Sequence, residues 1–172
     1  MSGHRKTAIL FAAAASVSGA LLLAPSAWAG QAPAWNGQYL LTVSADAKTG
    51  TSPAVRGSEY AQRGSYSLSS NCNTGVCVAR VDNAPAPKSQ YLPRGGQYTW
   101  NGSQWVQQAN WNFACQLPNG AIESDPARSI TAYTPGARGA LNGRFHTDIL
   151  SGACRGTVDM PVTMTPVQTP VV

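Results

Sequence analysis

Four cysteines are the residues whose spacing most directly predicts chemistry in this chain. Cys72 and Cys77 flank residues 73–76, which have the length of a hairpin loop and contain the turn-forming Asn and Gly, so the two sulfur atoms should lie on facing strand ends. Cys115 and Cys154 fall on strand faces that we expect to point inward. Among the possible pairings, this geometry favours Cys72–Cys77 and Cys115–Cys154 as structural disulfides.

A metal site is the competing interpretation of these cysteines. The Cys-x4-Cys spacing of Cys72 and Cys77 resembles half of a zinc knuckle, but no Cys-x2-Cys pair and no clustered histidines complete such a site. An even number of cysteines is typical of disulfides in a chain that carries an export signal, and residues 1–29 have the pattern of one. We therefore predict no metal site.

The residues that could support histidine-based catalysis lie around one position. His146 is the only histidine beyond residue 29, and it alternates with Arg144 and Asp148 along one face of a predicted strand. Residues two apart on a strand lie about 6.5 to 7 Å apart, which we interpret as too far for the orienting hydrogen bond of a catalytic triad. This face is therefore predicted to be an ordinary solvent-facing strand surface.

The closely spaced carboxylates are the other candidates for acid–base chemistry. Glu123 and Asp125 fall between two prolines, in residues 118–126, where we expect a solvated loop. A glycosidase needs two carboxyl groups that flank a cleft. The sequence also lacks a Gly-x-Ser-x-Gly elbow, paired metal-binding histidines and a Gly-rich phosphate loop. We predict no catalytic residue and no cofactor, which favours a non-enzymatic protein.

Three aromatic residues around a predicted hairpin are the candidate binding residues. Tyr98, Trp100 and Trp105 flank a turn whose central pair is either Asn-Gly or Gly-Ser within residues 101–103. In both registers the three rings share one face, because an even loop preserves side-chain parity across the turn. Such a face could stack on sugar rings or anchor a protein. It could equally fill one end of a core that has only three Phe residues.

Period-two alternation of apolar side chains recurs along the chain, whereas helical periodicity does not. The sequence therefore predicts an all-β fold, a single antiparallel sandwich or barrel-like domain with two disulfides. Four strands have faces that we expect to point into the core: Tyr39, Leu41 and Val43; Tyr66, Leu68, Ser70 and Cys72; Cys77, Ala79 and Val81; and Cys154, Gly156, Val158, Met160 and Val162.

The first 29 residues have the pattern of a signal peptide. Two basic residues precede an apolar stretch, and an Ala-Trp-Ala pattern occupies residues 27–29. We predict cleavage after Ala29, a secreted β domain over residues 30–162, and a Pro-rich C-terminal tail over residues 163–172. Since no second apolar span follows, we expect no stable membrane anchor after cleavage.

The charge of the remaining chain is modest. Loss of the two basic residues in the signal leaves ten basic and seven acidic residues, a net charge of +3. The basic residues are spread singly, whereas nucleic-acid binding normally needs a concentrated basic stripe. We predict no nucleic-acid partner, and the sequence indicates no particular oligomeric state.

Several short elements carry a resemblance to known proteins. They are the Trp-Asn-Gly-Gln-Tyr of residues 35–39, the Cys72–Cys77 hairpin followed by Val-Ala, the aromatic hairpin, Cys115, and the Ser-Gly-Ala-Cys of residues 151–154. With the predicted signal, the chain resembles small secreted mycobacterial proteins of unknown function. More distantly, it is similar to Cys-paired β domains of mycobacterial lipoproteins and of kinase extracellular regions. The resemblance covers most of residues 35–162 and implies a β fold and an envelope or extracellular location. It carries over no catalytic residues.

These observations favour a secreted, non-enzymatic β domain that binds a protein or a glycan at the cell envelope or in the host. The alternative is a cell-envelope hydrolase whose site is assembled from dispersed residues. A cleft that gathers His146 or several carboxylates would indicate the hydrolase, whereas an apolar or aromatic patch would indicate the binding domain.

Overall fold

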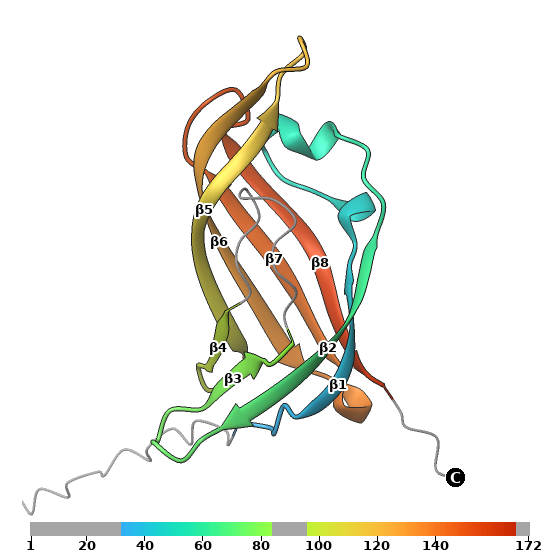
Figure 1. The fold of residues 1–172 in the computed structure, drawn as a ribbon, viewed down its shortest axis with the longest axis vertical. Coiled ribbons are helices and arrows are strands. Elements are labelled where there is room, and N and C mark those ends of the chain that lie inside the picture. The colour runs from blue at the N-terminus through green and yellow to red at the C-terminus, as the bar shows by residue number, and fades with distance from the viewer. Residues whose placement is uncertain (1–31, 84–95, 168–172) are drawn as a thin grey trace, which may run out of the picture.

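The computed structural model describes residues 32–83 and 96–167, which form a closed antiparallel β-barrel (Figure 1). The predicted signal peptide lies outside the described residues. Each strand pairs with the next along the chain, and β8 pairs with β1 to close the ring. This confirms the all-β prediction and selects the barrel over the sandwich. The elements are β1 (Gly37–Val43), η1 (Ala45–Ala47), η2 (Pro53–Arg56), β2 (Gln62–Asn71), β3 (Val78–Val81), β4 (Gln97–Trp100), β5 (Trp105–Gln116), β6 (Ile122–Pro135), η3 (Ala137–Gly139), β7 (Leu141–Ile149) and β8 (Gly156–Pro166).

The strands differ in length, and four long ones stand side by side. β5 pairs with β6 over its whole length, and β7 pairs with both β6 and β8 in long ladders. β3 and β4 are only four residues long, and they lie near the lower end of the barrel in Figure 1. The long strands β5 to β8 therefore supply most of the wall that surrounds the barrel interior.

One end of the barrel is closed by aromatic packing, and we call it the aromatic end. Trp35, which precedes β1, inserts its ring among side chains from several strands and is only 1% exposed. Its ring centroid lies 5.0 Å from that of Tyr98, 5.7 Å from that of Trp105 and 5.5 Å from that of Tyr133. Tilted and edge-to-face contacts at these distances are the preferred geometry of aromatic pairs, so this cluster seals the end without a covalent bond.

The opposite end is closed by a disulfide, and we call it the disulfide end. Cys115 of β5 is bonded to Cys154, which lies two residues before the start of β8, and both are buried with Ala127, Ile149 and Val158. The second disulfide joins Cys72 to Cys77 across the β2–β3 hairpin. Both predicted pairings are therefore confirmed.

The face alternation predicted for the last strand is confirmed and continues further than expected. Val158 and Val162 are buried, and so is Met164. β8 extends to Pro166, beyond the boundary that we placed at residue 162. A proline removes one ladder donor, but the next amide, of Val167, donates to the carbonyl of Gln38 (2.8 Å), so the pairing with β1 persists.

The loop predicted for residues 118–126 is wrong over most of its length. The turn is short, since the amide of Leu117 donates to the carbonyl of Ala121 (2.8 Å), and β6 begins at Ile122. Pro126 sits within this strand, where its carbonyl accepts a hydrogen bond from the amide of Leu150 (2.9 Å). The carboxylates of this segment therefore lie on a strand and not in a loop.

Candidate functional site

A cavity of about 580 Å³ lies inside the barrel between its two ends. Its walls come from the middle parts of β1, β5, β6, β7 and β8. Volumes of this size are typical of small-molecule sites, and barrels of eight strands have interiors that can hold one small ligand. The cavity is therefore the candidate functional site.

Most side chains that line the cavity are apolar or aromatic. Inward-facing residues of its walls, such as Leu41, Phe145 and Met160, are only half-buried, so solvent reaches the interior face. An accessible apolar surface of this kind favours the binding of an apolar molecule. The apolar lining consists of Leu41, Val43, Ala45, Ala54, Tyr98, Ala109, Trp111, Phe113, Ala114, Tyr133, Phe145, Val158, Met160 and Val162.

Small residues at inward positions leave this space open. Ala109 on β5 and Ser129 and Thr131 on β6 occupy positions where larger side chains would fill the barrel. Sequence analysis did not identify these residues. The available signal was the set of small residues Ala127, Ser129 and Thr131 at alternate positions before Tyr133.

Two polar groups of the cavity wall, on Trp111 and Ser129, form a hydrogen-bonded chain with the buried Thr147. The indole Nε1 of Trp111 donates to Ser129 Oγ (2.7 Å), and that hydroxyl lies 2.7 Å from the hydroxyl of Thr147. Because buried polar atoms cost free energy when they lack partners, these hydrogen bonds let the wall carry neutral polar groups at low cost.

Two tyrosines at the border of the cavity stay un-ionised. Burial raises the pKa of Tyr98 well above its ordinary value, and the neighbouring Tyr66 raises it further. Burial likewise raises the pKa of Tyr133, with smaller contributions from Tyr98 and Tyr66. Their hydroxyls therefore add neutral hydrogen-bonding groups and no charge to the site.

One ion pair lies beside the cavity. Lys48 Nζ is 2.7 Å from Glu59 Oε1, and the lysine side chain is only 5% exposed whereas that of Glu59 is 51% exposed. The two charges cancel, so the pair gives the cavity no net charge.

The aromatic hairpin turns its rings inward. Trp100 faces Trp105, and the amide of Asn101 donates to the carbonyl of Gln104 (3.0 Å), so Gly-Ser forms the centre of the turn. Tyr98 and Trp105 are buried in the aromatic end, and Trp105 is 0% exposed. Trp100 packs against the same cluster. Binding by these three residues stays a prediction, and their burial leaves Tyr98, which lines the cavity, as the member placed to contact a ligand.

The prediction that His146 lacks an orienting hydrogen bond is wrong. Its Nδ1 lies 2.8 Å from Asp159 Oδ1 across the β7–β8 pair, and its Nε2 lies 3.2 Å from Asp148 Oδ1. The spacing of two residues along a strand was correct for the backbone, but the side chains lean toward each other and close the gap. Partial burial lowers the pKa of His146, but the hydrogen bonds and charges of Asp159 and Asp148 outweigh it, so the net pKa is raised.

His146 does not join the other candidate catalytic groups. It lies on the outer face of β7, because Phe145, which lines the cavity, and the buried Thr147 point inward. Glu123 and Asp125 lie at the disulfide end, where Asp125 is buried. The structure thus separates the residues that a dispersed hydrolase site would have to gather.

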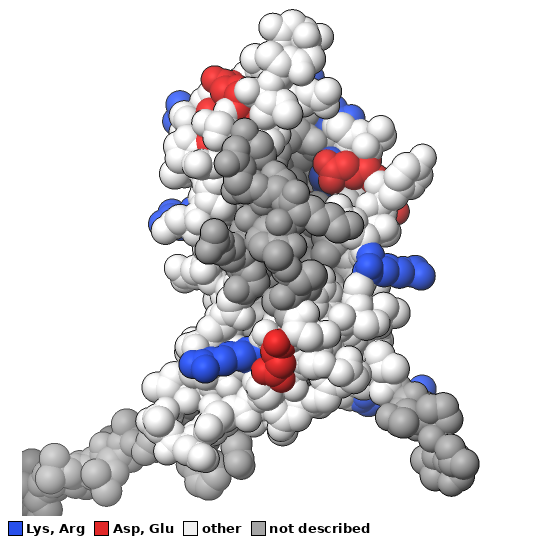
Figure 2. Space-filling view, viewed as in Figure 1, with Lys and Arg blue, Asp and Glu red and all other residues white. Residues whose placement is uncertain are grey.

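Charged side chains are scattered on the surface that is visible in Figure 2. Lysines and arginines occur singly on this face, and several lie beside acidic residues. Within the described residues of this view there is no basic stripe of the kind that follows a phosphate backbone.

These features define the class of the protein: a disulfide-bonded antiparallel barrel of eight strands with an apolar cavity. No protein-family model matches the chain, and no curated protein matches it. Among solved structures, it is similar to the monomer form of the M. tuberculosis PknI sensor domain, with a TM-score of 0.55 and 14% identity over 80% of this chain and 90% of that chain. Identity this low shows a shared fold alone.

This similarity supports the distant resemblance to a mycobacterial kinase extracellular region at the level of the fold. The closer resemblance to small secreted mycobacterial proteins stays a prediction. The two disulfides fit an extracellular location. Among the helices of the described chain, none combines the length and the apolar character needed to cross a bilayer.

Proposed function

We propose that this protein is a secreted, non-enzymatic barrel that binds a small, largely apolar, uncharged molecule in its interior. The cavity of about 580 Å³, apolar and reached by solvent, is the observation that carries the proposal. Burial of an apolar ligand surface contributes about 25 cal/mol per Å², so even partial occupancy of such a cavity supports useful affinity.

The lining determines which ligands fit. Lys48 and Glu59 neutralise each other, so a charged ligand group would have to displace one of them. Neutral hydrogen-bonding groups are supplied by Gln107, Ser129 and Thr131. A mainly hydrophobic molecule with one or two neutral polar groups therefore matches the site.

The other candidate functions have less support. An exposed stacking face for a glycan or a protein partner is hard to reconcile with the burial of Tyr98 and Trp105. A hydrolase would need convergent acid–base groups, yet among the described cavity residues Glu59 is the one carboxylate and there is no histidine. The cavity itself is therefore the favoured binding site.

An uncharged fluorescent probe, N-phenyl-1-naphthylamine, tests this function. It should bind the purified, disulfide-bonded protein with a Kd on the order of 10 µM, with increased fluorescence. Ala109→Trp places a large ring into the cavity and should weaken binding at least about tenfold.

Asn110→Trp is the matched control, because Asn110 is exposed on the outer face of the same strand. It should bind the probe like the natural protein. Absence of probe binding to the natural protein, or equal binding by both variants once circular dichroism shows that they are folded, would contradict the proposed function.

A further inference from the structure

We propose that Glu123 and Asp125 form a binding site for a divalent cation of the calcium type at the disulfide end of the barrel. The site is separate from the cavity and does not depend on the function proposed for it. Its occupant would connect the start of β6 to the loop between β7 and β8.

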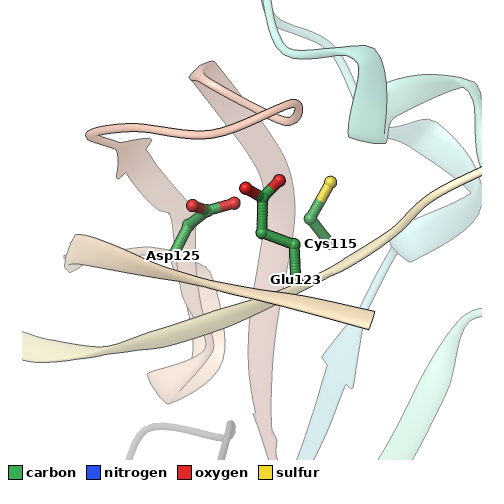
Figure 3. A group of neighbouring side chains, drawn as sticks. All are labelled: Cys115, Glu123 and Asp125. Atoms are coloured by element: carbon green, nitrogen blue, oxygen red, sulfur yellow. The ribbon is translucent and has the colours of Figure 1, made fainter. Parts of the chain in front are cut away.

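The two carboxylates are brought together by the strand that carries them. They are two residues apart on β6 and so project from the same face. One oxygen of each lies within 4.8 Å of the other and of Cys115 Sγ (Figure 3). Because Cys115 is bonded to Cys154, its sulfur is no thiolate ligand, and it instead fixes the neighbouring strand.

Asp125 provides the observation that points to a ligand. The residue is only 4% exposed, and its Oδ2 has no hydrogen-bond partner among the described residues. Its Oδ1 accepts one hydrogen bond, from Ser151 Oγ (3.2 Å). In Figure 3 the carboxyl group of Asp125 is directed toward that of Glu123. A buried carboxylate with a free oxygen beside a second carboxylate is unfavourable unless a positive charge compensates it.

The loop that follows β7 encloses this pair. Gly152 has a φ of +73°, and a Cβ atom there would lie 2.1 Å from Asp125 Oδ1, so only glycine lets the backbone pass so close to the carboxylate. The amide of Ala153 donates to Glu123 Oε2 (2.9 Å). This loop therefore packs against both carboxylates, and it leaves Asp125 Oδ2 without a hydrogen-bond partner among the described residues.

The donor set selects the kind of ion. Carboxylate and hydroxyl oxygens are hard ligands, which suit Ca²⁺, whereas Zn²⁺ would need imidazole or thiolate groups. Glu123 is half-buried, so water can complete the coordination shell. A site with only two carboxylates should be weak, with a Kd on the order of 1 mM, comparable to that of extracellular calcium modules.

A calcium titration of the intact, disulfide-bonded protein tests this site. At constant ionic strength, 10 mM Ca²⁺ should raise the Tm by about 4 °C relative to EDTA, with saturation near millimolar concentrations. Calorimetric titration should give the same Kd. Magnesium at the same concentration should have a smaller effect, because it gives up its water ligands reluctantly.

Glu123→Gln is the decisive variant, since glutamine keeps an oxygen that can accept the Ala153 amide but removes the charge. In EDTA its Tm should equal or exceed that of the natural protein, because the repulsion between the carboxylates is gone. In 10 mM Ca²⁺ the order should reverse. Asp125→Asn should also lose the calcium response, but Glu123→Gln carries the test if that variant does not fold.

Asp46→Asn makes the same kind of chemical change at an exposed carboxylate of η1, outside this site, and should keep the full calcium response. The proposal is overturned if calcium leaves the Tm of the natural protein unchanged. It is also overturned if Glu123→Gln responds to calcium as the natural protein does.

Discussion

The two ends of the barrel are closed by different physical means. At the aromatic end, Trp35, Tyr98, Trp105 and Tyr133 pack ring against ring, although they come from positions far apart in the sequence. At the disulfide end, the closing contact is the covalent bond of Cys115 to Cys154. The first arrangement stabilises the folded state by burial, whereas the second acts mainly by restricting the unfolded chain.

The difference shows how a small barrel can keep a cavity open. Large rings and a cross-link fix the two ends, so the middle of the barrel can carry small inward residues such as Ala109 and Ser129. Interior space in a barrel costs packing contacts. Firm closure at both ends offsets that cost without filling the site.

Removal of a ring from the aromatic end should have the largest effect. Trp105→Ala should lower the free energy of unfolding by about 3 to 5 kcal/mol, because a 0% exposed indole is replaced by a cavity. Urea denaturation followed by circular dichroism measures this change. A loss below about 1 kcal/mol would show that the aromatic end does not depend on this ring.

Removal of the Cys115–Cys154 disulfide should have a comparable effect. The bond closes a loop with a sequence separation of 39, for which the loop-entropy model gives about 4 kcal/mol. The double variant Cys115→Ala, Cys154→Ala avoids a free thiol. Its denaturation midpoint should fall strongly, and an unchanged midpoint would contradict the role assigned to the disulfide end.

The Cys72–Cys77 disulfide should matter less than the other one. Its sequence separation is 5, and the same model gives about 2 kcal/mol. Cys72→Ala, Cys77→Ala should therefore unfold at a urea concentration between those of the natural protein and the other double variant. The reverse order of the two double variants would show that loop length does not determine how these bonds stabilise the barrel.

The ion pairs of His146, on the outer face of the barrel, should make the smallest contribution to stability. They provide a reference for the larger contributions of the two ends. Since the folded-state pKa of His146 is raised, its contribution is complete below the ordinary histidine pKa of about 6.5 and is lost as the pH rises through the folded-state value. The side chain is 31% exposed, so we expect no more than about 1 kcal/mol.

His146→Gln isolates this contribution from other titrating groups. The natural protein should lose more stability than the variant between about pH 5.5 and pH 8.5. Parallel stability curves for the two proteins over this range would show that the ion pairs of His146 contribute nothing.

Side-chain parity and local turns were predictable from the sequence because they depend on neighbouring residues. The inward faces of Val158 and Val162 and the Cys72–Cys77 hairpin follow from alternation and loop length alone. The barrel closure depends on the pairing of β1 with β8, which lie at opposite ends of the chain. The alternation of apolar side chains indicates which face of a strand points inward. It does not indicate the distance between opposing walls of the barrel, so the cavity was not predicted.

Cross-strand partners were missed for a related reason. His146 meets Asp159 through the register of β7 and β8, which no spacing within one strand reveals. Asp125 was assigned to a loop because prolines bracket its segment, yet Pro126 is accommodated within β6. Both errors arose because a local sequence pattern was used to predict contacts that depend on strands distant in the sequence.

The most direct test of the binding cavity uses the two methionines in the described part of the chain. Met160 lines the cavity, whereas Met164 is buried in the core of the aromatic end. In an NMR titration of protein labelled at the methionine methyl groups, N-phenyl-1-naphthylamine should shift the Met160 signal progressively and leave the Met164 signal almost unchanged. Equal shifts of both signals, or none at Met160 while the probe binds, would contradict a ligand site inside this barrel.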